Sequence, residues 1–308
     1  MYQQIPTASA NSNANALRGN TASDLFQAHR LTAESESEVL NFLAERPLHT
    51  VAMTGFIRDN GLESPANRGS FYGVRNYRGE LEGVALVGHA TLMETRTQRA
   101  VLAFAGVAQK TSTTHMILGE QERVEEFWSF YEGGGQDMRL ACRESLFELR
   151  KPVEEQEEIT NLRLATLDEL ELIVPVQAQM AFKESGIDPL ERDAEGFRQR
   201  CKRRIEMGRT WVLVEDGTLI FKADVMSDTT EVVYLEGVWV NEKGRGAGYG
   251  VRCMSQLSRQ LLQHTKAISL LVDERNKRAQ SFYRKCGFRF ISTYDTIFLA
   301  QEDDATFN

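Results

Sequence analysis

The sequence predicts an α+β fold, with a mixed sheet and flanking helices in each of two halves. The chain has 308 residues, which is room for one large domain or two ordinary ones. Its composition, 42% hydrophobic and 26% charged, is typical of globular proteins that bury a core. Segments with strand and helix periodicity also follow a similar order in the two halves.

The first half is predicted to consist of a tail and one domain. Residues 1–25 are rich in Asn, Ser and Ala and lack the apolar segment of a signal peptide, so we expect a disordered tail. In the domain, residues 26–150, the pattern predicts a helix over 35–44, strands over 71–75, 81–87 and 100–105, and an aromatic helix over 124–131. The segment after Phe104 has one glycine and predicts no phosphate-binding loop.

The second half follows an acidic linker, residues 151–161, which begins with Lys151-Pro152. A second domain is predicted over residues 162–302. Its expected elements are a strand over 162–164, helices over 168–180 and 193–207, a hairpin over 210–214 and 219–225, and a strand over 232–240.

A glycine-rich loop after the strand 232–240 indicates an anion site. Gly246, Gly248 and Gly250 lack a Cβ, so the backbone can approach a phosphate closely. Lys243 and Arg245 add positive charge beside them. The next segment has apolar residues at helical spacing, which places the loop at a helix N-terminus, where N–H groups and the macrodipole attract anions. The loop is therefore predicted to hold a pyrophosphate.

Two familiar phosphate loops fit this segment poorly. A P-loop has Lys-Ser or Lys-Thr after its last glycine, whereas Val251 follows Gly250. A dinucleotide loop, G-x-G-x-x-G, would place its third glycine at Val251. The acidic Asp273 at the end of the next strand keeps a dinucleotide-dependent oxidoreductase open as an alternative.

The same segment resembles motif A of the GNAT superfamily of acetyl-CoA-dependent N-acetyltransferases. The resemblance rests on the loop Lys243-Gly244-Arg245-Gly246-Ala247-Gly248 and, after the next strand, on Asn276, Ala279, Phe282, Tyr283, Gly287 and Phe288 in family order. It implies tandem GNAT-like domains, each with a central, mostly antiparallel twisted sheet flanked by helices. The first half would be a degenerate copy without a cofactor loop, or alternatively an unrelated α+β cap.

The resemblance also implies an acetyl-CoA site and no metal. Cofactor-binding residues carried over from the family are Val238, Val240, Lys243, Gly244, Arg245, Gly246, Ala247, Gly248, Tyr249, Gly250, Asn276 and Tyr283. Tyr283 matches the general acid for the CoA thiolate, with packing beneath the cofactor as its alternative role. Asn276 is expected to bind the pantetheine arm or to cap a helix.

Glu236 is the candidate catalytic base, with a structural ion pair as its alternative role. Strand alternation is expected to put Glu236, Val238 and Val240 on one face. Tyr234 would share that face and line the acceptor pocket. Trp211 and Trp239 are interpreted as core residues.

The predicted function is transfer of an acetyl group from acetyl-CoA to a primary amine of unknown identity by direct attack. A non-catalytic acyl-CoA sensor is the main alternative. The net charge of −8 argues against a nucleic-acid partner, and no apolar run is long enough to span a membrane. Four widely spaced cysteines suggest free thiols and a cytoplasmic location. A homodimer is a further possibility.

Overall fold

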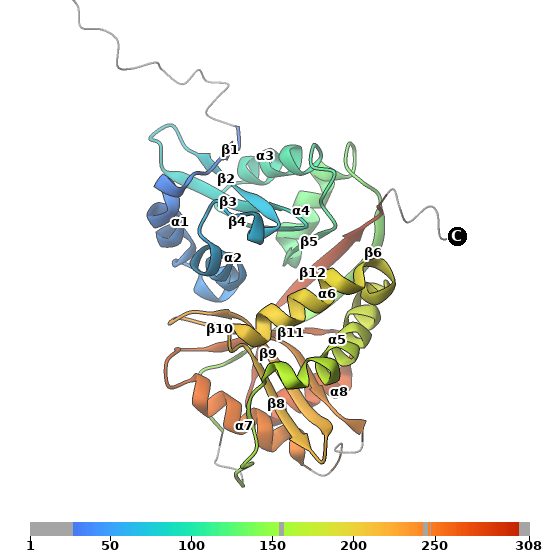
Figure 1. Ribbon diagram of the computed structural model, residues 1–308. Coiled ribbons are helices and arrows are strands. Elements are labelled where there is room, and N and C mark those ends of the chain that lie inside the picture. Colours follow the sequence, from blue (N-terminus) through green and yellow to red (C-terminus); the bar gives the residue numbers. More distant parts are fainter. Residues whose placement is uncertain (1–26, 154–156, 243–245, 247, 302–308) are drawn as a thin grey trace, which may run out of the picture.

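The computed structural model describes residues 27–153, 157–242, 246 and 248–301 (Figure 1). Its strands form one twelve-stranded sheet in the order β1-β2-β3-β4-β5-β12-β6-β11-β10-β9-β8-β7. Helices lie on both faces of this sheet, and the two halves of the chain occupy its two ends (Figure 1). The mixed α/β architecture agrees with the fold predicted from the sequence.

The N-terminal half follows the order strand, two helices, three strands, helix, strand, helix, strand. Its elements are β1 (His29–Arg30), α1 (Glu36–Leu43), α2 (Pro47–Asn60), β2 (Gly69–Arg75), β3 (Leu81–Gly88), β4 (Ala90–Thr95), α3 (Gln98–Ala108), β5 (Met116–Glu120), α4 (Gln121–Tyr131) and β6 (Met138–Leu149).

The C-terminal half repeats this order. Its elements are β7 (Arg163–Leu164), α5 (Leu170–Ser185), α6 (Pro189–Glu206), β8 (Thr210–Glu215), β9 (Thr218–Asp228), β10 (Val233–Val240), α7 (Tyr249–Leu261), β11 (Ile268–Asp273), α8 (Lys277–Lys285) and β12 (Arg289–Leu299). The predicted helices and strands of this half are all present, with shifts of a few residues at their ends.

The two halves exchange their last strands. β6 lies between β11 and β12, and β12 lies between β5 and β6, with antiparallel pairing throughout. Phe147 and Leu149 of β6 are buried in the core of the C-terminal half, whereas Ile297 and Leu299 of β12 are buried in the core of the N-terminal half. Each half therefore completes its sheet with a strand supplied by the other.

One predicted strand of the N-terminal half is wrong. Residues 100–105 belong to helix α3, because the buried Ala100, Val101, Phe104, Ala105 and Ala108 recur at helical spacing on one face. The strand expected there is β4, whose buried Leu92 is accompanied by Glu94 and Thr95, and these polar residues hid it from a pattern based on hydrophobicity.

Helices cover the two faces of the C-terminal sheet with different partners. On one face, here called the α7 face, Val233, Leu235 and Leu270 pack with residues of α7 and α8. On the opposite face, called the α5 face, helices α5 and α6 cover β8 and β9, and α2 of the N-terminal half packs beside Tyr234 and Leu271. Helix α2 thus lies at the junction of the halves, above β9 and β10 (Figure 1).

Candidate active site

An opening in the sheet lies between β10 and β11. These parallel strands are paired only at Val233↔Ile268 and Tyr234↔Ser269. Beyond Tyr234 the described part of β10 has no register partner on its β11 side, so its backbone groups face the opening. Such a divergence of two strands leaves room for an extended ligand to lie along the exposed backbone.

A β-bulge follows at Gly237, which has a φ of 59°. The pairing of β10 with β9 shifts register between Glu236 and Trp239. One extra residue reverses the side-chain alternation, so Trp239 packs on the α5 face with α5 and α6. Val238 and Val240 pack on the α7 face instead. The expectation that Glu236 shares a face with these two valines is therefore wrong.

The glycine loop leads into α7 in the way the sequence predicts. Gly246 and Gly248 have φ values of 87° and 83°, which favour glycine, and Gly248 is the N-cap of α7. No side chain caps this end and its first turn has no acidic residue, so the helix N-terminus remains suited to an anion. A Cβ at Gly250 would lie 3.1 Å from Phe282 and from Val240. Lys243, Gly244, Arg245 and Ala247 lie outside the described residues.

A cavity of about 740 Å³ joins the loop to the opening in the sheet. Its lining includes Val238, Val240, Gly246, Gly248, Gly250, Asn276 and Tyr283. The structure therefore brings together all but one of the described residues that the sequence assigned to the cofactor. The exception is Tyr249, whose hydroxyl donates to Glu215 at 3.2 Å and which is absent from this lining.

Tyr283 lies on α8 with its ring among Phe147, Phe282 and Phe288. The side chain is buried, and burial raises the pKa of its phenol above the usual range, so the hydroxyl stays protonated. It therefore combines the packing role with the protonation state that a general acid needs. Asn276 caps α8, because its Oδ1 accepts from the N–H of Ala279 at 3.0 Å. Asn276 also lines the cavity.

Glu236 lies on the α5 face beside Tyr234, with which its carboxylate is hydrogen bonded. The surface of Glu236 is exposed to solvent. Protein atoms nevertheless surround its carboxylate closely enough to remove part of its hydration. Loss of hydration raises the pKa of Glu236, while Arg204 and the Tyr234 hydrogen bond oppose the rise. Among the described residues no Lys or Arg forms an ion pair with Glu236 within 4.0 Å, so its carboxylate is available to a ligand.

Two further carboxylates near Glu236 were missed by the sequence analysis. Loss of hydration, with added repulsion from Glu236, raises the pKa of Glu144 to about 7 and that of Glu184 to about 8. Glu184 lies on α5, and Glu144 lies on β6, where Thr296 donates to it at 2.7 Å. Glu144 comes from the other half of the chain and reaches this site only through the strand exchange.

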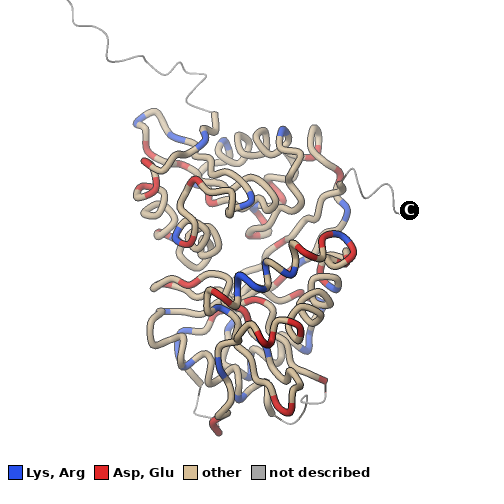
Figure 2. The backbone as a smooth tube through the Cα atoms, in the orientation of Figure 1, with Lys and Arg blue, Asp and Glu red and all other residues tan. Residues whose placement is uncertain are grey.

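A buried network of charged side chains contacts the bulge of β10 at Gly237. Lys222 and Asp224 of β9 are both almost fully buried and pair at 2.5 Å, and Arg204 of α6 pairs with Asp224 at 2.8 Å. Lys222 also donates to the carbonyl of Gly237 at 3.2 Å. Figure 2 shows other Lys and Arg residues along α6 beside this site. Alternating polar residues within an otherwise apolar strand were the sequence signal for this network.

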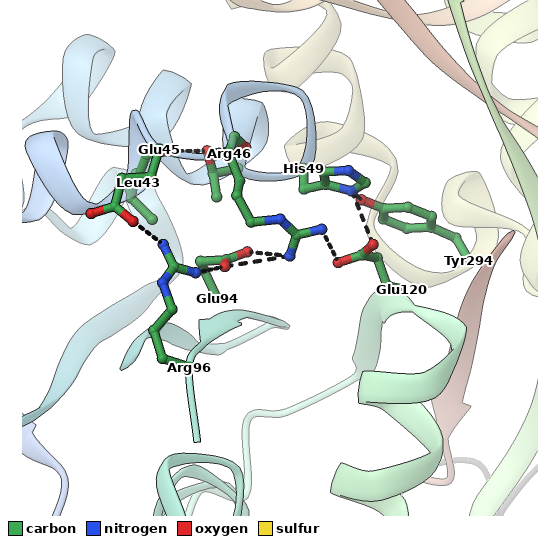
Figure 3. A network of polar contacts seen from close by, with 9 residues as sticks. Leu43, Glu45, Arg46, His49, Glu94, Arg96, Glu120 and Tyr294 are labelled. Carbon is green, nitrogen blue, oxygen red and sulfur yellow. Dashed lines mark hydrogen bonds and ion pairs between the residues drawn. The ribbon is translucent and has the colours of Figure 1, made fainter. Parts of the chain in front are cut away.

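The corresponding opening of the N-terminal half is filled by side chains. β4 and β5 are paired in parallel only at Ala90↔Met116 and Thr91↔Ile117, and then diverge. Arg46 lies between them and pairs with Glu94 at 3.2 Å and Glu120 at 2.7 Å (Figure 3). The loop between β4 and α3 is Arg96-Thr97, without glycine. This half therefore has no counterpart of the glycine loop in the part that the structure describes.

Neither a metal site nor a membrane span is found in the described residues. No group of three or more His, Cys, Asp or Glu side chains there could hold a metal ion. No described helix is both long and apolar enough to cross a bilayer.

Comparison with known proteins identifies the fold. A sequence profile of the acetyltransferase (GNAT) family matches residues 177–288. A GNAT-family acetyltransferase from Colwellia psychrerythraea is 13% identical with a TM-score of 0.53, and the match covers 89% of this chain and 100% of that one. A tandem GNAT protein from the clavulanic acid biosynthesis pathway is 16% identical with a TM-score of 0.57, covering 90% and 99%. A Drosophila protein is 12% identical with a TM-score of 0.64, covering 89% and 98%.

No curated protein matches the chain. The matched structures span both halves, so the chain has the tandem acetyltransferase fold, and the N-terminal half shares it. Residues 177–288 form a domain of the GNAT family. The family resemblance drawn from the glycine loop and the Asn276–Phe288 segment is thereby confirmed.

Proposed function

We propose that the protein transfers an acetyl group from acetyl-CoA to a primary amine by direct attack. The observation that carries this proposal is the opening between β10 and β11. Glu236 lies on the α5 face, at the edge of this opening, whereas Tyr283 and the glycine loop line the cavity of about 740 Å³. A base and an acid on different sides of one opening suit a reaction in which a nucleophile enters from one side and a thiolate leaves on the other.

The cavity fits the co-substrate. The uncapped N-terminus of α7 and the positive φ angles of Gly246 and Gly248 suit a pyrophosphate. The edge of β10 at Val238 lies beyond the last register pair with β11, and its backbone groups suit an extended pantetheine arm. A bound acetyl-CoA supplies the thioester that is attacked.

Each proton in the reaction has a candidate carrier. Glu236 accepts a proton from the substrate ammonium, directly or through a water, which frees the nitrogen lone pair. The nitrogen then forms a bond to the acetyl carbon as the carbon–sulfur bond breaks, and the second proton of the nitrogen passes to solvent water. Tyr283 donates its phenolic proton to the leaving sulfur. Solvent later returns a proton to the Tyr283 phenolate and removes the one held by Glu236. Holding the amine beside the thioester lowers the entropic part of the barrier.

The direct test is release of free CoA thiol from acetyl-CoA in the presence of a panel of primary amines. We expect release that depends on both substrates and is lost in Gly246→Asp, where a carboxylate would stand in the phosphate site. Binding of acetyl-CoA without thiol release for any amine would favour the non-catalytic sensor. Failure to bind acetyl-CoA at all would refute the proposal.

A further inference from the structure

A second cavity, of about 60 Å³, lies beneath α2 at the junction of the halves. Its roof includes Val51 and Ala52 of α2, and its floor includes Leu146 of β6, Tyr234 of β10 and Leu271 of β11. Toward the N-terminal opening the cavity is lined by Arg46 and its polar partners (Figure 3). Both halves of the chain are therefore needed to form this cavity.

The side chains that line the cavity toward the N-terminal opening are paired with one another. His49 contacts the hydroxyl of Tyr294 at 2.8 Å and Glu120 at 3.4 Å, and Arg46 contacts the same Glu120 at 2.7 Å (Figure 3). Burial lowers the pKa of His49, so its ring is neutral at pH 7. The charges at this end are therefore already paired within the protein.

The cavity opens onto the carboxylates of the candidate active site. Side chains two residues apart on a strand share a face. Two residues along β10 from Tyr234 is Glu236, and the same step along β11 from Leu271 leads to Asp273. β6 runs antiparallel, with Leu146 opposite Leu271 and Glu144 opposite Asp273. On each of these three strands, therefore, a residue that lines the cavity has a carboxylate two residues away, and all three carboxylates lie on the same side of the cavity.

Contact between the two sites is direct at Tyr234. Its side chain lines the cavity and hydrogen bonds to Glu236. At the other wall Tyr294, which also lines the cavity, is the cross-strand neighbour of Glu144. A ligand held in the cavity would thus present its outer end to Glu236 and Glu144.

Two buried hydroxyls mark the polar part of the cavity wall. Ser269 and Thr95 line it and are 0% and 5% exposed. Neither hydroxyl has a hydrogen-bond partner within the described ranges. Buried hydroxyls are normally contacted by water, so we expect water beside these two, and the chain of a ligand to occupy the apolar remainder of the cavity.

We propose that this cavity binds the body of the acceptor, so that the substrate is a primary amine with a short, mainly apolar chain. The ammonium lies among Glu236, Glu144 and Glu184, and the chain extends under α2 into the N-terminal half. This inference rests on the proposed acetyl transfer, whose acceptor it specifies.

The volume sets the length of the chain. A water-sized group needs roughly 10–15 Å³ of such space, so the cavity holds about four to six groups. Each buried methylene contributes about 0.8 kcal/mol, which is close to a fourfold gain in affinity. Efficiency should therefore rise with each added carbon until the cavity is full, and then stop rising.

The test is acetylation of unbranched primary amines from ethylamine to n-octylamine, followed by thiol release. From ethylamine to a chain of about four to six carbons, which adds about two to four methylenes, we expect kcat/KM to increase by roughly 10- to 200-fold, mainly through a lower KM. Longer amines should gain nothing further. An active enzyme whose kcat/KM does not depend on chain length would overturn the inference while leaving acetyl transfer intact.

Two variants with opposite effects locate the chain. Ala52→Leu fills the cavity, so the preferred amine should become shorter, and Val51→Ala enlarges it, so the preferred amine should become longer. Ala44→Leu is the matched control, because Ala44 is exposed and does not line the cavity. An unchanged preference in folded Ala52→Leu and Val51→Ala would contradict the proposed position of the chain.

A binding experiment separates this inference from the proposed function. If no amine releases thiol, acetyl transfer fails as the function, but the cavity can still be examined directly. n-Hexylamine should raise the melting temperature of the wild type more than ethylamine does, and Ala52→Leu should abolish the difference. Equal effects of the two amines on the wild type would overturn the inference.

Discussion

Glu236 is open to the acceptor side, hydrogen bonded to Tyr234 and enclosed enough that its pKa is raised. A raised pKa makes the carboxylate a stronger base near neutral pH. We expect Glu236→Gln to lower turnover at pH 7 by about 10²–10⁴-fold and to recover partly at higher pH, as free amine becomes more abundant. The measurement is a pH–rate profile of both proteins. Superimposable profiles would remove Glu236 from the mechanism, and a higher KM alone would leave it as an electrostatic anchor.

Tyr283 differs from its aromatic neighbours in carrying a hydroxyl that burial keeps protonated. Tyr283→Phe preserves the packing and removes only the acid. Turnover should fall by roughly 10²–10⁴-fold, whereas the Kd for acetyl-CoA should change little. Tyr131→Phe, which removes another buried tyrosine hydroxyl far along the chain, should leave turnover unchanged. Normal turnover in Tyr283→Phe, with chemistry rate-limiting, would assign the residue to packing.

Glu144 and Glu184 add a pH dependence of their own, because their pKa values are raised to about 7 and about 8. Below these values both groups are neutral, and above them both are negative. An alkylammonium remains cationic through this range, so its KM should fall as the pH rises from about 6 to 9. The double variant Glu144→Gln with Glu184→Gln should flatten this trend. A KM that rises with pH in the wild type would contradict the assignment.

At the scale of the strand, the bulge of β10 depends on Gly237. A Cβ there would lie 2.8 Å from Lys222 Nζ and 2.9 Å from Asp224 Oδ2, and the φ of 59° is strained for other residues. Gly237→Ala should destabilise the fold by about 1–3 kcal/mol. Gly217→Ala is the control, since Gly217 has a φ of 70° with nothing within 4 Å. Chemical denaturation should show the larger loss at Gly237, and equal losses would mean that only backbone strain matters.

The same strand illustrates what sequence reasoning can and cannot predict. The glycine loop, α7 and the capped α8 follow from local signals such as Gly248 and Asn276, and the structure has them where expected. The bulge could not be foreseen, because Gly237 reads equally well as a regular strand glycine until its partner strand is known. The place of Glu144 in the site could not be predicted for a similar reason, since it depends on which strand pairs with β11.

At the scale of the whole molecule, neither half has a complete sheet of its own. A chain divided within the linker, between Lys151 and Asn161, would leave β11 without β6 and β5 without β12. Each fragment produced alone should expose unpaired strand edges and aggregate. The two fragments produced together should associate and recover thiol release, as measured by co-purification and activity. Cooperative unfolding of either fragment as a stable monomer would contradict this expectation.

The exchanged strands also limit how the protein can move. β6 and β12 are joined by ten register pairs and lie in the middle of the sheet, directly between the two openings. A hinge rotation of one half against the other would have to break this central ladder, at a cost that ordinary substrate binding does not supply. We therefore expect substrate entry and product release to use small displacements of surface helices such as α2 and α5. The two halves should thus keep a fixed relative orientation while the helices that cover the sites move.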